Sequence, residues 1–177
     1  MKSKLTTLLL ALTLSISAQE DTKDYSKQVT TLDSTIETLY TVISGDAGVE
    51  RNWELFRYLF HKDAKLIPSG KTKDGKHTAR YMTPDDYINN SGNWLYNNGF
   101  HEIELHREVH SFGNITQVFS TYESYKSLQD KNDKEPFMRG INSIQLMNDG
   151  ERWWIINIFW MQESEGHPIP EAYLPKN

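Results

Sequence analysis

The sequence contains no cysteine, so it forms no disulfide, carries no lipid anchor on cysteine and offers no thiol nucleophile. Its stability must therefore come from an ordinary hydrophobic core. The sequence also lacks an excess of positive charge, because 19 Lys and Arg stand against 24 Asp and Glu, for a formal net charge of −5. A nucleic-acid-binding protein is expected to carry a basic patch. We therefore expect no nucleic-acid partner.

Long hydrophobic runs are absent as well. The run Leu5–Leu14 is too short to span a bilayer, which requires roughly 20 apolar residues. It follows Lys2 and Lys4 and precedes small residues, an order typical of a signal peptide. A buried N-terminal helix is the alternative, but the segment that follows is polar. We expect cleavage after Ser17 or Ala18, export to the periplasm or out of the cell, and no membrane span in the mature chain.

The mature chain has the length of one domain, about 160 residues. Without the two N-terminal lysines its formal charge is −7 instead of −5. It contains no internal repeat and no linker between domains. We therefore predict a signal peptide at 1–18, a flexible start at 19–24, one domain at 25–163 and a Pro-rich tail at 164–177.

Three helices are predicted in the first half of the domain. Apolar residues recur every three and four positions over 29–43, which is one face of an amphipathic helix. A second helix fits 52–60, whose first residue is an asparagine suited to capping. Thr83, with the proline and two aspartates after it, begins the third. We expect this helix to falter at Ser91–Gly92 and to end by Gly99.

The second half of the domain alternates apolar and polar residues, which predicts strands. Turn signals at Gly113–Asn114 and Asp149–Gly150 join these strands into two long hairpins. A charged loop at 127–136 lies between the hairpins. The strands are expected at 64–68, 78–82, 100–110, 115–125, 137–147 and 151–162.

The order of these elements resembles that of the nuclear transport factor 2-like superfamily, which includes SnoaL-like and ketosteroid-isomerase-like members. The segments "FGNITQVFSTYESY" and "RGINSIQLMNDGERWWIINIFW" carry the most specific part of a resemblance that covers Ser26–Glu163. It implies an α+β fold, in which a strongly curved, mixed and mostly antiparallel sheet wraps around three N-terminal helices. The result is a cystatin-like cone with a pocket at its wide end. Homodimers through the outer sheet face are common in such proteins.

The second hairpin places asparagines on a face that is otherwise apolar. A two-residue turn at Asp149–Gly150 sets Asn142 opposite Asn157, with Trp153 and Phe159 on the same inward face. A buried amide without a partner costs about 1–3 kcal/mol. The two amides must therefore bond each other, another protein group, water or a ligand.

The first hairpin contributes a lone cation to its inward face. A turn at Gly113–Asn114 sets Arg107 opposite Ser120, and Leu105 opposite Tyr122. Since a buried unpaired charge is costly, Arg107 should meet a carboxylate from a helix or a ligand in the pocket. The predicted ligand-binding residues are Asn142, Asn157, Arg107, Ser120, Tyr122, Trp153, Phe159, Trp94 and Tyr40.

The outer face of the second hairpin mixes apolar and charged residues. Arg139 opposite Trp160 suggests a cation–π pair, and Trp154 lies on the same face. Such a face is too apolar to stay in open water. We expect a homodimer to cover it, with the C-terminal tail as the alternative.

No cofactor and no metal ion is expected. In "HREVH", His106 and His110 lie four residues apart on a strand, about 13 Å, so they cannot share one zinc ion. His106 with Glu104 or Glu108 is the remaining metal hypothesis, and a solvated or interface face is favoured over it. The inward residues include no carboxylate and no histidine, which counts against an enzyme.

We therefore predict an exported domain that binds a small hydrophobic or amphipathic molecule in a pocket with a few polar groups. One alternative is a SnoaL-like enzyme of isomerase, dehydratase or cyclase type, which transfers protons on a small ring substrate. The other is a structural or dimerisation domain without a functional pocket.

Overall fold

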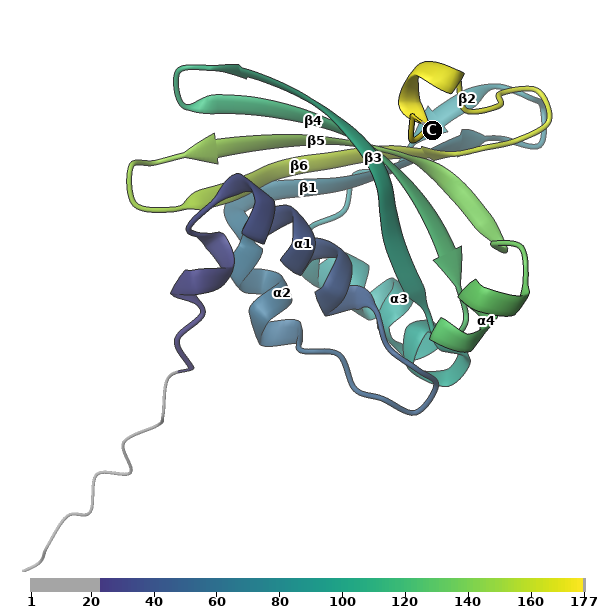
Figure 1. The fold of residues 1–177 in the computed structure, drawn as a ribbon, viewed down its shortest axis with the longest axis horizontal. Helices are drawn as coiled ribbons and strands as arrows, with labels where there is room; N and C mark the ends of the chain where they lie inside the picture. Colours follow the sequence, from purple (N-terminus) through teal and green to yellow (C-terminus); the bar gives the residue numbers. More distant parts are fainter. Residues whose placement is uncertain (1–22, 177) are drawn as a thin grey trace, which may run out of the picture.

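A computed structural model describes residues 23–176 and shows an α+β fold. Six strands form one sheet that curves around three helices (Figure 1). The helices are α1 (Leu32–Ile43), α2 (Trp53–Leu59), α3 (Pro84–Asn98) and a short α4 (Leu128–Asp133), with 3-10 turns η1 (Ser26–Val29) and η2 (Glu171–Tyr173). The strands are β1 (Phe60–Lys71), β2 (His77–Ala79), β3 (His101–Phe112), β4 (Ile115–Tyr125), β5 (Met138–Asn148) and β6 (Trp153–Gln162).

The sheet has the strand order β2-β1-β6-β5-β4-β3. All neighbouring strands are antiparallel except β1 and β6, which run parallel. The prediction of a curved, mostly antiparallel sheet around three N-terminal helices is therefore confirmed. The short α4 occupies the segment that was predicted to be a charged loop. No helix within residues 23–176 is long and apolar enough to cross a membrane.

The predicted starts of α2 and α3 are confirmed by their caps. The side chain of Asn52 accepts from the Leu55 N–H, and Thr83 forms a capping box with Asp86. The predicted break at Ser91–Gly92 is wrong, because α3 continues to Asn98. Gly92 serves close packing instead: a Cβ there would lie 3.3 Å from the Trp53 ring of α2.

The register of β3 against β4 is correct near the turn and wrong further along. Arg107 pairs with Ser120 as predicted, but Leu105 has no partner in β4 and forms a β-bulge. Tyr122 consequently pairs with Glu104 and not with Leu105. Because side chains alternate along a strand, one extra residue exchanges the two faces. The first part of β3 therefore presents its carboxylates to the concave side of the sheet.

The register of β5 against β6 also differs from the prediction. The turn holds four residues, 149–152, instead of two, and Ile156 is bulged out of β6. Asn142 therefore pairs with Trp160, and Asn157 points to the opposite face. The predicted pair of asparagines is wrong, while the inward position of Asn142 is confirmed by its burial.

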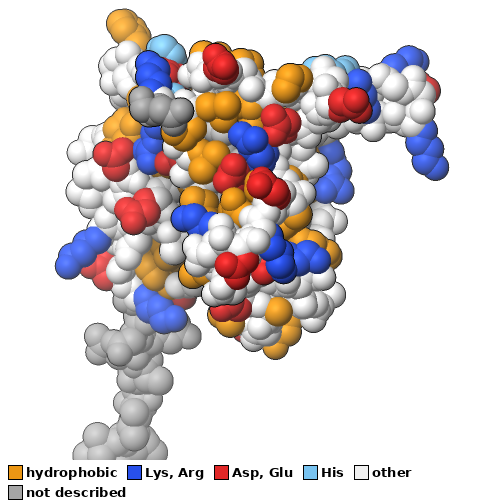
Figure 2. All heavy atoms as spheres, turned by 45° about the vertical axis from the view of Figure 1, so that its right-hand side comes forward, with side chains coloured by type: hydrophobic (Ala, Val, Ile, Leu, Met, Phe, Trp, Pro, Cys, Tyr) orange, Lys and Arg blue, Asp and Glu red, His pale blue; other side chains and the backbone are white. Residues whose placement is uncertain are grey.

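The outer face of the sheet is partly covered by the C-terminal segment. The Tyr173 ring packs on Phe119 with centroids 5.0 Å apart, and the Tyr173 carbonyl accepts from the Thr121 hydroxyl. Figure 2 shows acidic and basic side chains interspersed with hydrophobic ones on the side that η2 and α4 occupy. The tail alternative thus holds for part of this face, and the homodimer stays a prediction.

The residues predicted for the dimer face separate in the structure. Trp160 points to the concave side and therefore does not stack on Arg139, which lies within 3.5 Å of both Glu123 and Glu163. Trp154 lies on the outer side, where the Arg152 guanidinium stacks on its ring at 3.6 Å. The predicted cation–π pair of Arg139 with Trp160 is wrong, since the bulge at Ile156 reverses the face of Trp160.

Gly140 makes room for the ring of Tyr122. A Cβ at Gly140 would lie 2.6 Å from the Tyr122 hydroxyl oxygen and 2.5 Å from the Met161 carbonyl. We expect Gly140→Ala to lower the free energy of unfolding by about 1–3 kcal/mol, because this overpacking moves the ring or the backbone. Urea unfolding measures the loss. Gly70→Ala is the matched control, as a Cβ there meets no atom within 4 Å; equal effects at both sites would contradict the prediction.

Candidate functional site

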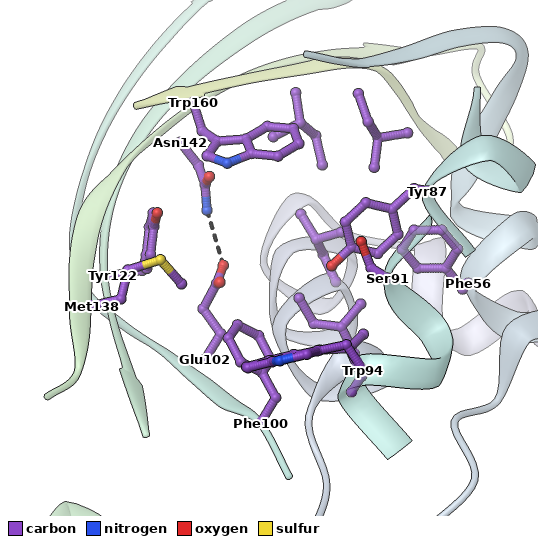
Figure 3. A pocket seen from close by; sticks show the side chains of 15 residues that line it. Phe56, Tyr87, Ser91, Trp94, Phe100, Glu102, Tyr122, Met138, Asn142 and Trp160 are labelled. Carbon is purple, nitrogen blue, oxygen red and sulfur yellow. Dashed lines mark hydrogen bonds between the residues drawn. The ribbon is translucent and has the colours of Figure 1, made fainter. Parts of the chain in front are cut away.

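A cavity of about 200 Å³ lies between the concave face of the sheet and helices α1, α2 and α3 (Figure 3). Its wall is mostly apolar, with polar groups at a few positions. The apolar wall consists of Leu39, Ile43, Phe56, Leu66, Trp94, Leu95, Phe100, Met138, Ile158 and Trp160. The polar groups are Tyr87, Ser91, Glu102, Tyr122 and Asn142.

Glu102 of β3 points into this cavity toward Asn142 of β5 (Figure 3). The Asn142 Nδ2 group donates a hydrogen bond to Glu102 Oε1 at 3.2 Å. Burial raises the pKa of the Glu102 carboxyl to about 7, and the bond from Asn142 opposes this rise in part. Near neutral pH the carboxyl therefore exists in both its protonated and its ionised form.

Hydroxyl groups face the cavity from other directions. Tyr87 and Ser91 of α3 lie across the cavity from Glu102, and Tyr122 of β4 lies beside Met138 (Figure 3). The hydroxyls of Tyr87, Ser91 and Tyr122 have no hydrogen-bond partner among residues 23–176, so they can form hydrogen bonds with a ligand in the cavity. Burial first, and then the charge of Glu102, raises the pKa of Tyr87 above its ordinary value. Tyr87 thus remains a neutral donor.

A chain of hydrogen bonds leads from Asn142 away from the cavity. The same Nδ2 group donates to the Tyr40 hydroxyl oxygen at 3.1 Å. The Tyr40 and Ser120 oxygens are 2.7 Å apart, and Ser120 donates to Glu104 Oε1 at 2.5 Å. Tyr40 and Ser120 are almost fully buried, so this chain satisfies polar groups that water does not reach.

Solved structures with the same architecture are found at low sequence identity. A protein of unknown function with a cystatin-like fold from Nostoc punctiforme has a TM-score of 0.55 and 8% identity, over 75% of this chain and 89% of that one. A protein from Pseudomonas putida, described as nuclear transport factor 2-like and of unknown function, has a TM-score of 0.55 and 10% identity, over 81% and 93%. The chain adopts the nuclear transport factor 2-like fold.

A third similar structure is named as a candidate ketosteroid isomerase from Parabacteroides distasonis. Its TM-score is 0.50 at 13% identity, over 75% of this chain and 88% of that one. No family model matches the sequence, and no curated protein matches it. These likenesses show the fold, and the chemistry of the site follows from the residues of this chain.

Arg107 lies outside the cavity, at the outer end of the hydrogen-bond chain. Its guanidinium donates to Glu104 Oε2 from Nε at 3.0 Å, and to Asp33 of α1 at 2.9 Å. The sequence predicted that Arg107 meets either a carboxylate from a helix or a ligand, and the structure provides the carboxylate. His106 Nε2 lies 3.0 Å from Glu108, and no group of three His, Asp or Glu within residues 23–176 is arranged to hold a metal ion.

The predicted site residues fall into three groups around the cavity. Asn142, Tyr122 and Trp94 line it. A second group, Tyr40, Ser120 and Arg107, belongs to the chain behind Asn142. Trp153 packs on the core, while Asn157 and Phe159 face the outer side, where Phe159 is 45% exposed. Binding of a ligand by any of these residues stays a prediction.

Sequence reasoning missed the only carboxylate among the residues that line this cavity. No carboxylate was expected on the inward face, because the alternation in 100–110 was interpreted without the bulge at Leu105 that turns Glu102 inward. Ser91 was missed because α3 was expected to falter there, and Tyr87 was missed because it was not recognised as sharing a helix face with Trp94. The available signal was the length of the run after Thr83, since an uninterrupted helix places Tyr87, Ser91 and Trp94 on one face.

Proposed function

We propose that the chain binds a small, mainly apolar ring compound in this cavity and exchanges a proton with it through Glu102. The observation that carries the proposal is the Glu102 carboxyl, which points into an apolar cavity and has a pKa of about 7. A general acid or base works best when its pKa lies near the operating pH. The name of the Parabacteroides distasonis neighbour fits this class of reaction.

The geometry supports removal of a proton from a carbon next to a carbonyl group. The ionised form of Glu102 accepts the proton, and the protonated form returns it to another position of the ring. The negative charge that develops on the carbonyl oxygen is stabilised by neutral donors on the opposite wall, Tyr87 and Ser91. The large rings of Trp94 and Trp160 flank the space between the two walls (Figure 3).

The size of the cavity sets the size of the compound. An apolar cavity of about 150 Å³ accommodates one benzene ring, so about 200 Å³ suits one ring with short substituents. The mostly apolar wall equally supports a second function, in which the chain binds such a compound without chemistry.

Export is part of the proposal. Residues 1–18 lie outside the described residues, and their basic, apolar and small segments support a signal peptide. Mass spectrometry of the protein expressed from its full sequence measures the N-terminus. A mature chain that begins at Ala18 or Gln19 is expected, whereas retention of Met1 in exported material would contradict cleavage.

Hydrogen–deuterium exchange of cyclic ketones, followed by NMR in D₂O, tests the proposed reaction. We expect the protein to accelerate exchange at carbons next to the carbonyl, with a rate that rises with pH through about 7 as Glu102 ionises. Glu102→Gln should lower the rate by at least about 100-fold. The matched control is Glu108→Gln, which removes a carboxylate of β3 that pairs with His106 away from the cavity.

The outcomes separate the two functions. Exchange that depends on Glu102 supports proton transfer. Binding of the ketones without exchange supports the binding function and overturns the proposed reaction. Neither binding nor exchange, with ketones of one and two rings, would overturn both functions.

A further inference from the structure

The hydrogen-bond chain formed by Asn142, Tyr40, Ser120 and Glu104, here called the relay, runs from the cavity to an ion pair at the edge of the sheet. We propose that the relay positions the Asn142 amide, so that its N–H group and not its carbonyl oxygen faces Glu102. Tyr40, Ser120 and Glu104 are thus positioning residues. This inference rests on the proposed role of Glu102 and assigns control of that group to residues outside the cavity.

The direction of the relay is fixed at its outer end. Glu104 is held by two N–H groups of Arg107, so its carboxylate only accepts hydrogen bonds. Ser120 has one hydroxyl proton, which it donates to Glu104. The Ser120 oxygen must therefore accept from its other neighbour, the Tyr40 hydroxyl, 2.7 Å away.

The direction is then transmitted to the amide. The Tyr40 hydroxyl donates its one proton to Ser120, so its oxygen can only accept a hydrogen bond from Asn142. Only the NH₂ end of the amide satisfies this requirement, and its second N–H reaches Glu102. A flipped amide would set its oxygen against two acceptors, Tyr40 and the ionised Glu102.

The tyrosines around Glu102 stay neutral near neutral pH. Tyr40 of α1, Tyr87 of α3 and Tyr122 of β4 face it, and burial raises the pKa of each tyrosine above its ordinary value. Glu104 of the same strand is paired with Arg107. The orientation of the Asn142 amide is therefore the variable that the relay controls.

The relay has a direct chemical effect on Glu102. An N–H donor stabilises the ionised carboxylate, which is the form that removes a proton. A flipped amide would instead accept from the protonated carboxyl and stabilise that form. The ion pair of Glu104 with Arg107 thus increases the share of Glu102 that is ready to act as a base.

Side-chain ¹³C NMR titration of glutamate carboxyls tests the relay without any ligand, with Glu102→Gln used to assign the signal. We expect Ser120→Ala to raise the Glu102 pKa by about one, since one hydrogen bond to the carboxylate is lost. Tyr40→Phe, a smaller change of shape, should act in the same direction. Ser124→Ala is the matched control, because Ser124 is fully buried opposite Glu102 in β4 and its hydroxyl has no partner among the described residues.

A double-mutant cycle decides whether Ser120 acts through Asn142. In the Asn142→Ala background, Ser120→Ala should leave the Glu102 pKa unchanged. An equal effect with and without Asn142, or no effect of Ser120→Ala and Tyr40→Phe in folded protein, would overturn the relay. Failure of the proposed reaction would appear separately, as ketones that do not exchange while the titration cycle behaves as expected.

Discussion

Replacing Glu102 by glutamine is expected to make the folded protein more stable at pH 8, although it removes the group proposed for proton transfer. The carboxyl has a pKa of about 7 in the folded protein, against an ordinary value of 4.5. Because the folded state holds the proton more tightly, the stability from this group is complete below pH 4.5 and is lost as the pH rises to about 7. A difference of one pKa unit between the folded and unfolded states corresponds to about 1.4 kcal/mol, so wild type loses up to about 3 kcal/mol of stability.

Urea unfolding at pH 4.5 and pH 8 measures this effect. The Glu102→Gln variant should unfold at the same urea concentration as wild type at pH 4.5 and at a higher one at pH 8. Glu108→Gln, which removes a partly exposed carboxylate that pairs with His106, should follow wild type at both pH values. Parallel pH dependence of wild type and Glu102→Gln would show that the buried carboxyl is not the cause.

Replacing Arg51 by methionine is expected to lower the free energy of unfolding by about 3–5 kcal/mol. The side chain is 6% exposed and donates to backbone carbonyls of Ile43 at 2.9 Å, Gly45 at 2.6 Å and Leu95 at 3.2 Å. It thereby joins the end of α1 to the end of α3, where a cation also matches the helix dipoles. Methionine keeps most of the volume and leaves these buried acceptors without a donor.

Arg57→Met is the matched control for Arg51. Arg57 pairs with Asp85 at 2.7 Å, but its side chain is half exposed, and such pairs contribute about 0–1 kcal/mol. Chemical denaturation of both variants should therefore give a loss several times larger for Arg51. Since α1 and α3 form walls of the cavity, Arg51→Met should also weaken binding of a cavity ligand; equal losses of stability at the two positions would refute this role of Arg51.

The elements of the fold were predictable where their signals are local. Asn52 and Thr83 cap helices in the structure because their side chains bond N–H groups only three residues away. Gly113 adopts the positive φ angle that its predicted turn requires. Such features depend on a few consecutive residues, so the sequence alone contains the information.

The faces of the long strands were less predictable, because each bulge or extra turn residue shifts the pairing of every residue that follows it. The Asp149–Gly150 signal marked the correct turn, but the Asp149 carboxylate accepts from the N–H groups of Glu151 and Arg152 and widens it to four residues. That change shifts the register by two residues and keeps the faces, and the bulge at Ile156 then reverses them. No residue type marks that bulge, since it lies within a run of apolar residues whose two faces look alike.

The same reasoning explains which part of the site was found. Asn142 was placed correctly because a lone amide in an apolar row marks the inward face of β5 wherever its partner lies. Glu102 was misplaced because the bulge at Leu105 turns the face of Glu102 inward and the face of the apolar Ile103 outward, against the local alternation. Long-range packing, and not local preference, decides which of the two faces turns toward the helices.

The bulge at Leu105 also has a consequence for comparing related chains. Consider a related chain in which this strand has no bulge. An alignment without a gap at Leu105 would match Glu102 with a residue of that chain that points away from the cavity. If Leu105 were paired with Tyr122 in a regular strand, Glu102 would turn outward and Ile103 inward, whereas deletion of Leu105 would leave Glu102 opposite Ser124 on the inward face. In this strand, the acid that reaches the interior is specified by the bulge as much as by which residues the strand contains.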